Sequence, residues 1–210
     1  MIDFSVHLIT YNNEKHIEET IKSILKQQVS FNYEIVVGDD CSTDKTLVII
    51  EQYKKEYPER FKVFKNESRL GILKNFKKTL DRCKGRFIFP LAGDDLLKTE
   101  KSLQKMFDVL CENDSLGFID SGFDKYYDTS NKSSKFCNKN IITSNKKKYK
   151  EAILLGRTTP IGLCFNRKLL LKHVNFDIYI NKETTIDDYP MLVDLIMNTD
   201  FERIEESLVV

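Results

Sequence analysis

Four short apolar runs, separated by amphipathic segments, constrain the fold of this chain more than any other feature of its sequence. The runs cover residues 4–10, 33–38, 61–65 and 86–90. The segments between them have the apolar spacing of helices, as at Ile17, Ile21, Ile24 and Leu25. Strands and helices that alternate in this way favour a mostly parallel sheet with helices on both faces. We therefore predict an α/β fold.

Local signals predict where several helices begin and end. Asn12 or Asn13 is expected to cap the first helix, and Pro58 to stop the second. Thr99 is expected to cap a later helix. The inward face of that helix would carry Leu103, Met106, Phe107, Leu110 and Cys111.

The second half of the chain is less regular and predicts a small mixed region. Residues 116–127 indicate one or two strands, and the polar, lysine-rich stretch 128–148 indicates a loop. Residues 161–165 are typical of a strand. A helix is expected from about Asp188, followed by a final apolar strand in "ESLVV".

Length and composition exclude several classes of protein. The 210 residues fit one domain, and a net charge of +1 gives no general argument for nucleic acid binding. Five scattered cysteines and three histidines disfavour a disulfide framework and a zinc site, which indicates a reducing, cytoplasmic setting. The chain opens without the pattern of a signal peptide and holds no apolar stretch long enough to span a membrane. A peripheral contact with a membrane surface stays open.

Three acidic doublets are the strongest candidates for chemistry: Asp39-Asp40, Asp94-Asp95 and Asp187-Asp188. The first two follow predicted parallel strands, whose carboxyl ends meet at one edge of a sheet. A single doublet is more often a solvated turn or a helix cap, but two at one edge favour a bound cation. Oxygen ligands without nearby histidine or cysteine favour Mg²⁺ or Mn²⁺. Because the chain has neither a Walker A loop nor G-x-G-x-x-G, a metal-held diphosphate would supply the missing positive charge.

Several motifs in one order resemble the family 2 glycosyltransferases, which have the GT-A fold. They are a strand ending in Thr-Tyr-Asn, then "SILKQQ", "YEIVVGDDCSTDKT", "SRLGILKNFKKTLDRCKGRFIFPLAGDDLL", "TTIDDYPMLVDLIM" and "RIEESLVV". The resemblance covers essentially the whole chain. It implies a single catalytic domain, with residues 1–97 binding the nucleotide sugar and residues 98–210 forming the acceptor side. We expect such a chain to be compact or truncated after Val210.

The resemblance implies how the nucleotide would be held. Tyr11 matches the aromatic residue that stacks on the base, and Thr10 and Asn13 lie on the same loop. Asp40 matches the aspartate that accepts a hydrogen bond from a ring N–H of the base, whereas Asp39 is expected to shape the loop.

The remaining roles also follow from the resemblance. Arg69 and Lys74 lie where a basic side chain meets phosphate, and each is alternatively a solvent-facing residue. Asp94 matches the group near the ribose, and Asp95 matches the direct metal ligand. Asp188 matches the general base of an inverting transfer.

Two positions depart from the family pattern. Ala92 stands where an aspartate is common, and Cys41 stands where a glycine is usual. The first change leaves the metal with fewer carboxylates.

The resemblance favours transfer from a UDP-sugar to a hydroxyl of a glycan or lipid-linked acceptor, in bacterial cell-surface polysaccharide synthesis. Two alternatives remain. One is a catalytically silent module that binds sugar nucleotides or glycans. The other is a nucleotidyltransferase on a related sheet, which should show a glycine-rich, basic loop where this chain has "LITYNNEKH".

Overall fold

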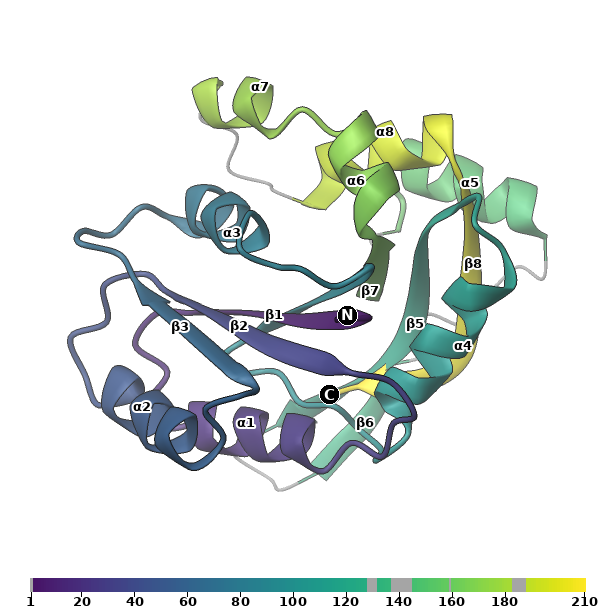
Figure 1. The fold of residues 1–210 in the computed structure, drawn as a ribbon. Coiled ribbons are helices and arrows are strands. Elements are labelled where there is room, and N and C mark those ends of the chain that lie inside the picture. Colours follow the sequence, from purple (N-terminus) through teal and green to yellow (C-terminus); the bar gives the residue numbers. More distant parts are fainter. Residues whose placement is uncertain (1, 128–131, 137–144, 159, 183–187) are drawn as a thin grey trace.

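The computed structural model describes residues 2–127, 132–136, 145–158, 160–182 and 188–210 (Figure 1). These residues form one sheet in the order β3-β2-β1-β4-β7-β5-β6, with β8 beside β5. Its strands are β1 (Phe4–Thr10), β2 (Tyr33–Asp39), β3 (Phe61–Lys65), β4 (Phe87–Ala92), β5 (Leu116–Tyr127), β6 (Lys132–Phe136), β7 (Ile161–Asn166) and β8 (Asp200–Val209).

The first four strands are parallel and in a register that aligns their carboxyl ends. β1 pairs with both β2 and β4, and β3 extends the sheet beyond β2. Thr10 lies opposite Asp39, and Ile9 lies opposite Ala92. The residues that follow β1, β2 and β4 therefore meet at one edge, as the apolar runs predict.

The rest of the sheet is mixed. β7 runs antiparallel to β4 and β5, β6 is antiparallel to β5, and β8 is parallel to β5. Because β7 runs opposite to β4, its first residues lie at the edge where β4 ends. The prediction of a mostly parallel sheet with a small mixed region is confirmed.

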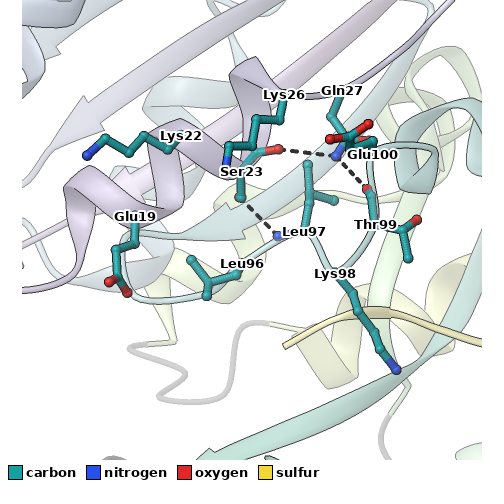
Figure 2. Close-up of a pocket in the computed structure, with 10 residues that line it drawn as sticks. All are labelled: Glu19, Lys22, Ser23, Lys26, Gln27, Leu96, Leu97, Lys98, Thr99 and Glu100. Carbon is teal, nitrogen blue, oxygen red and sulfur yellow. Dashed lines mark hydrogen bonds between the residues drawn. The ribbon is translucent and has the colours of Figure 1, made fainter.

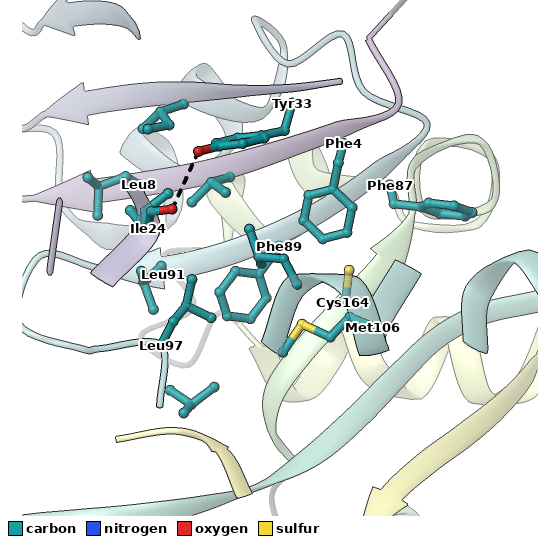
Figure 3. Packing of buried hydrophobic residues seen from close by; sticks show 14 of the residues in the cluster. Phe4, Leu8, Ile24, Tyr33, Phe87, Phe89, Leu91, Leu97, Met106 and Cys164 are labelled. Atoms are coloured by element: carbon teal, nitrogen blue, oxygen red, sulfur yellow. Dashed lines mark hydrogen bonds between the residues drawn. The ribbon is translucent and has the colours of Figure 1, made fainter. Parts of the chain in front are cut away.

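Helices cover both faces of the sheet (Figure 1). One face carries α1 (Ile17–Leu25), α2 (Thr46–Glu56) and α4 (Ser102–Glu112). The other carries α3 (Ile72–Leu80), α5 (Lys146–Leu154), α6 (Arg167–His173), α7 (Phe176–Asn181) and α8 (Asp188–Asn198). Phe4, Phe89 and Met106 pack into the first of these cores (Figure 3). Burial of such apolar side chains drives the layered arrangement.

The predicted helix caps were wrong. α1 begins after His16, without a side-chain cap, because the two asparagines bond elsewhere. Asn13 Oδ1 accepts hydrogen bonds within its own turn, and Asn12 Oδ1 accepts one from the backbone N–H of Thr43 at 2.9 Å. Thr99 lies two residues before Lys101, the N-cap of α4. Short polar side chains thus stabilise loops here in preference to helix ends.

Two further predictions need correction. The loop expected over 128–148 contains β6 and the start of α5, where Asn145 Oδ1 accepts from the N–H groups of Lys147 and Lys148. The other residues of that stretch lie outside the described ranges. Cys111 is exposed and does not face the core. No helix among the described residues has the length and apolar character needed to cross a membrane.

Candidate active site

The turn that follows β1 is held by its own side chains. Thr10 Oγ1 and the Tyr11 N–H both donate to Asn13 Oδ1, at 2.8 and 3.1 Å. Gly93, after β4, packs directly against this turn, and a Cβ there would lie 2.5 Å from Thr10 Oγ1. Only glycine fits at this distance. The predicted residues Thr10, Tyr11 and Asn13 therefore share one turn beside the Asp94-Asp95 pair.

Asp40 connects the end of β2 to the loop before α3. Its Oδ1 accepts from Asn66 Nδ2 at 3.0 Å and from the Leu70 N–H at 2.8 Å, and its Oδ2 accepts from the Gly71 N–H at 2.9 Å. A carboxylate offers about four acceptor positions. One position on Oδ2 is therefore left for a ligand, even though the side chain is buried.

The loop that Asp40 fixes brings Arg69 onto Tyr11. The centre of the Arg69 guanidinium lies 4.1 Å from the centroid of the Tyr11 ring, which is a cation–π contact. Sequence predicted these residues as donor-binding, and the structure brings them together. Lys74 lies exposed on α3 and makes no ion pair within the described part of the chain. The structure does not bring Lys74 into contact with the other predicted residues.

Asp39 has a different setting from Asp40. Its Oδ1 accepts from the Ser42 N–H at 3.0 Å, as expected of a residue that shapes the loop. Its Oδ2 is buried with no partner among the described residues. Cys41 then takes a left-handed conformation, with φ of 68°. This conformation favours glycine, which explains why the family pattern has glycine at that position.

Asp94 and Asp95 form the exposed turn after β4, where the Asp95 N–H donates to the Ala92 carbonyl oxygen at 3.2 Å. Surrounding protein and the charge of Asp94 raise the pKa of Asp95 to about 6, although part of its surface stays open to solvent. Such a pair fits a hard divalent cation, which takes oxygen ligands from one or two carboxylates and completes its shell with water and phosphate. No cluster of three or more ligating side chains occurs among the described residues. The departure at Ala92 therefore leaves a carboxylate pair rather than a complete protein cage.

A cavity of about 210 Å³ opens beside Asp95. The end of β4, the start of β7 and α8 line it, through Ala92, Ile161 and Met191 among others. Asp188 is the first residue of α8, the helix that contributes Met191 to this cavity. The structure describes the backbone of Asp188, whereas its side chain and the whole of Asp187 lie outside the described part of the chain.

A second cavity, of about 600 Å³, lies between α1 and residues 96–100 (Figure 2). Leu97 N–H donates to Ser23 Oγ at 3.1 Å, and Gln27 Nε2 donates to the Thr99 carbonyl at 2.7 Å. This cavity contains none of the residues predicted for catalysis or donor binding. We place the candidate site at the smaller cavity because the carboxyl ends of the parallel strands converge there.

Sequence reasoning did not assign a role to Asn66 or Asn75. Asn75 Nδ2 donates to the Gly38 carbonyl at 2.9 Å, and Asn75 Oδ1 accepts from Asn66 Nδ2 at 2.9 Å. This buried network holds the Asp40 carboxylate in place through Asn66. The spacing Gly71-x-x-x-Asn75 was the sequence signal that could have identified Asn75. No sequence signal indicated that residues 160–162 line the cavity beside Asp95.

Curated proteins from bacteria are similar in sequence to part of this chain. The chain is 36% identical over 119 residues to the putative teichuronic acid biosynthesis glycosyltransferase TuaG of Bacillus subtilis, a match that covers 57% of this chain and 46% of TuaG. It is 37% identical over 101 residues to the poly(ribitol-phosphate) beta-N-acetylglucosaminyltransferase TarS of Staphylococcus aureus, covering 48% of this chain and 18% of TarS. The curated relatives are thus matched over less than half of their length, and the first of them over 31%.

Solved structures share the fold. The crystal structure of S. aureus TarS 1–349 superposes with a TM-score of 0.79 at 23% identity, covering 99% of this chain and 60% of that one. A glucosyl-3-phosphoglycerate synthase from Mycobacterium tuberculosis, solved with Mn²⁺ and UDP, gives 0.64 at 17% identity and covers 100% and 71%.

The sequence profile of glycosyl transferase family 2 matches residues 5–174, which is most of the chain. The matched region includes the turn after β1, the Asp40 network and the Asp94-Asp95 pair. This chain therefore belongs to glycosyl transferase family 2.

Proposed function

We propose that the chain transfers a sugar from a UDP-sugar to a hydroxyl group of a glycan or lipid-linked acceptor, with inversion at the anomeric carbon. One observation carries the proposal. The register of β1, β2 and β4 brings the Tyr11 turn, Asp40 and the Asp94-Asp95 pair to one edge, beside a cavity that α8 closes. Solved relatives of this fold include complexes with UDP, UDP-GlcNAc and Mn²⁺. The names of TuaG and TarS suggest cell-surface polymers as the acceptor class.

The donor would lie along the edge from Tyr11 to Asp95. The Tyr11 ring stacks on the base, and Arg69 already covers that ring. The open position on Asp40 Oδ2 accepts from a ring N–H of the base. Asp94 then approaches the ribose. These contacts would orient the anomeric carbon toward the cavity beside Asp95.

At the acceptor, Asp188 is proposed as the general base. The acceptor oxygen forms a bond to the anomeric carbon while its proton passes to the Asp188 carboxylate. The bond from the anomeric carbon to the diphosphate oxygen breaks, and UDP leaves with that electron pair. A single displacement of this kind inverts the anomeric configuration.

Asp95, with Asp94 beside it, would hold the divalent cation, Mn²⁺ or Mg²⁺. When bound, the cation would offset the negative charge that develops on the leaving diphosphate. The raised pKa of Asp95 fits this role, because burial first and the charge of Asp94 second disfavour its ionised form, and a cation would offset both.

Calorimetry with UDP tests the donor site. We expect the wild-type chain to bind UDP in the presence of Mn²⁺ and to lose most of that affinity in EDTA. Asp95→Asn should abolish the metal-dependent part. Asp108→Asn is the matched control, because Asp108 is an exposed carboxylate on α4 and is not among the residues that line the cavity beside Asp95. Equal UDP affinity with and without metal would contradict the metal assignment. Metal-dependent binding without release of UDP from any UDP-sugar would favour the silent binding module.

A further inference from the structure

A basic cavity lies next to the proposed active site. It encloses about 340 Å³ between β5, β8 and the segment that leads into β7. We define it by Lys125, Arg157, Ile161 and Arg203, together with Tyr149 and Glu205. Pro160 and Ile161 line both this cavity and the one that contains Asp95. The two cavities therefore adjoin, and one extended molecule can occupy both.

Basic side chains outnumber acidic ones among the described residues that line the basic cavity. Lys125, Arg157 and Arg203 line it, and Glu205 is its acidic residue among those that the structure describes. Asp120 lies behind Arg203 and accounts for one further negative charge. Lys125 has an interaction of its own, so the cation that stays available to a ligand is Arg157, which makes no ion pair among the described residues. A group with negative charge is therefore the ligand that this lining favours.

Arg203 is fixed in orientation. Its Nη1 donates to Asp120 Oδ2 at 2.7 Å and to the Tyr149 hydroxyl at 2.6 Å. The Tyr149 hydroxyl also donates to Asp120, and the guanidinium centre lies 4.9 Å from the centroid of the Tyr149 ring. The Arg203 side chain nevertheless keeps 26% of its surface exposed. Because its position is set before a ligand arrives, little entropy is lost on binding.

Arg157 is the adaptable cation of the cavity. It is exposed, and it makes no ion pair within the described ranges of the chain. Its backbone is held by a hydrogen bond from its N–H to the Ala152 carbonyl at 2.8 Å. Phe123, Pro160 and Ile161 add apolar surface, of which Ile161 is 39% exposed. An apolar floor with a basic rim suits a sugar or polyol that carries an anionic substituent.

We propose that the basic cavity binds an anionic group of the acceptor, a phosphate or a carboxylate, on the unit that precedes or follows the one being glycosylated. This inference rests on the proposed function, because it assigns the substrate class of the same site. Phosphate and carboxylate share the chemistry that the cavity recognises, and direct binding of small probes distinguishes them.

The test is an NMR chemical-shift titration of the ¹⁵N-labelled chain, at fixed ionic strength, with four probes. Glycerol 3-phosphate and methyl glucuronide carry the charge, and glycerol and methyl glucoside are their neutral counterparts. We expect at least one anionic probe to bind about tenfold more tightly than its neutral counterpart, as a charge-assisted contact implies. The tighter of the two anionic probes identifies the acceptor chemistry.

Arg157→Gln should weaken binding of that anionic probe about fivefold, because it removes one of the exposed cations of the site. Lys172→Gln removes the same charge from the exposed surface of α6 and should leave binding unchanged. Equal binding of charged and neutral probes, or an equal response of the two variants, would overturn the inference.

A titration with UDP and Mg²⁺ on the same samples separates the two proposals. UDP binding that is equal in wild type and Arg157→Gln, combined with no preference for anionic probes, rejects the basic cavity alone. Absence of UDP binding in the wild type rejects the proposed function. In that case a preference for anionic probes still supports the cavity as an anion site.

Discussion

The proposed donor side (residues 1–97) and the proposed acceptor side (residues 98–210) bury a carboxylate in different ways. On the donor side, Asp40 accepts from two backbone N–H groups and from Asn66. On the acceptor side, Asp120 is bonded to the side chains of Tyr149 and Arg203. The first arrangement fixes the course of the main chain. The second fixes only side chains, and substitutions can alter it without moving a strand. We infer that the donor side is the more constrained half of the domain.

The largest expected effect falls where the two sides meet. Asp188→Asn should lower release of UDP from a UDP-sugar by about 10²–10⁴-fold, the usual contribution of a general base. UDP affinity should not change, because the donor contacts lie on other elements. Asp177→Asn, an exposed aspartate on α7, is the matched control. A variant at Asp188 with a near wild-type rate would remove the base assignment.

Breaking the donor-side network should cost stability. Asp40→Ala leaves Asn66 Nδ2 and the N–H groups of Leu70 and Gly71 without their acceptor, which should lower the free energy of unfolding by about 3 kcal/mol. Asp40→Asn keeps one acceptor oxygen, so its free energy of unfolding should lie between those of the wild type and Asp40→Ala. Urea denaturation measures both, with exposed Asp108→Ala expected to change stability by less than about 0.5 kcal/mol. A loss as small as that of the control would mean that the loop is held by other contacts.

The network of Asp120, Tyr149 and Arg203 should instead make the stability of the domain depend on pH. Burial is the main cause that raises the pKa of Asp120 to about 6, with the charge of Arg203 opposing it. Because the folded state then holds this proton more tightly than the unfolded state, the contribution of Asp120 to stability is greatest below about pH 4. It falls as the pH rises toward 6.

Asp120→Asn should remove this dependence. Relative to wild type, the variant should gain on the order of 2–3 kcal/mol of stability between pH 4 and pH 7. Thermal or urea unfolding across that range gives the difference. A constant difference between the two proteins would show that Asp120 is ionised throughout and that Arg203 outweighs burial.

The smallest expected effect concerns Cys41, in the loop that follows β2. Cys41→Gly should raise the free energy of unfolding by at most about 1 kcal/mol, because glycine adopts a φ of 68° without steric cost. The greater freedom of glycine in the unfolded state reduces the gain. Cys83→Ala is unsuitable as a control because Cys83 is buried, so exposed Cys111→Ala serves instead. Destabilisation by Cys41→Gly would indicate that the weak hydrogen bond from the Cys41 thiol to the Glu67 carbonyl oxygen, at 3.7 Å, outweighs the strain at this position.

Sequence predicted the parallel half of the fold well because its signals are local and repeated. Each strand is a compact apolar run, and β1 and β3 have the predicted bounds. The acceptor side was harder. β6 consists of "KSSKF", which lacks the alternation of apolar and polar residues that predicts a strand. It pairs with β5, and nothing in its own sequence signals that pairing.

The candidate site followed the same division. Tyr11 and Asp40 were proposed because they sit in recognisable motifs at strand ends, and Arg69 because of the family resemblance. The structure places the Arg69 guanidinium over the Tyr11 ring and joins Asp40 to the backbone N–H of Leu70, the next residue. The basic cavity was not foreseen, since Lys125, Arg157 and Arg203 come from separate elements that only the folded sheet unites. The caps expected at Asn12 and Asn13 show the opposite error, in which a plausible residue type bonds a different partner from the one expected. The role of Lys74 stays a prediction.

The end of β8 is tied to the segment that follows Asp95. Leu96 and Val210 exchange backbone hydrogen bonds of 2.7 and 2.8 Å, and the Lys98 N–H donates to the Leu208 carbonyl at 2.9 Å. A fluorophore or spin label at position 210 would thus sit beside Leu96, the residue that follows Asp95. Such a label would report, in real time and without any acceptor, whether that turn shifts when a nucleotide arrives.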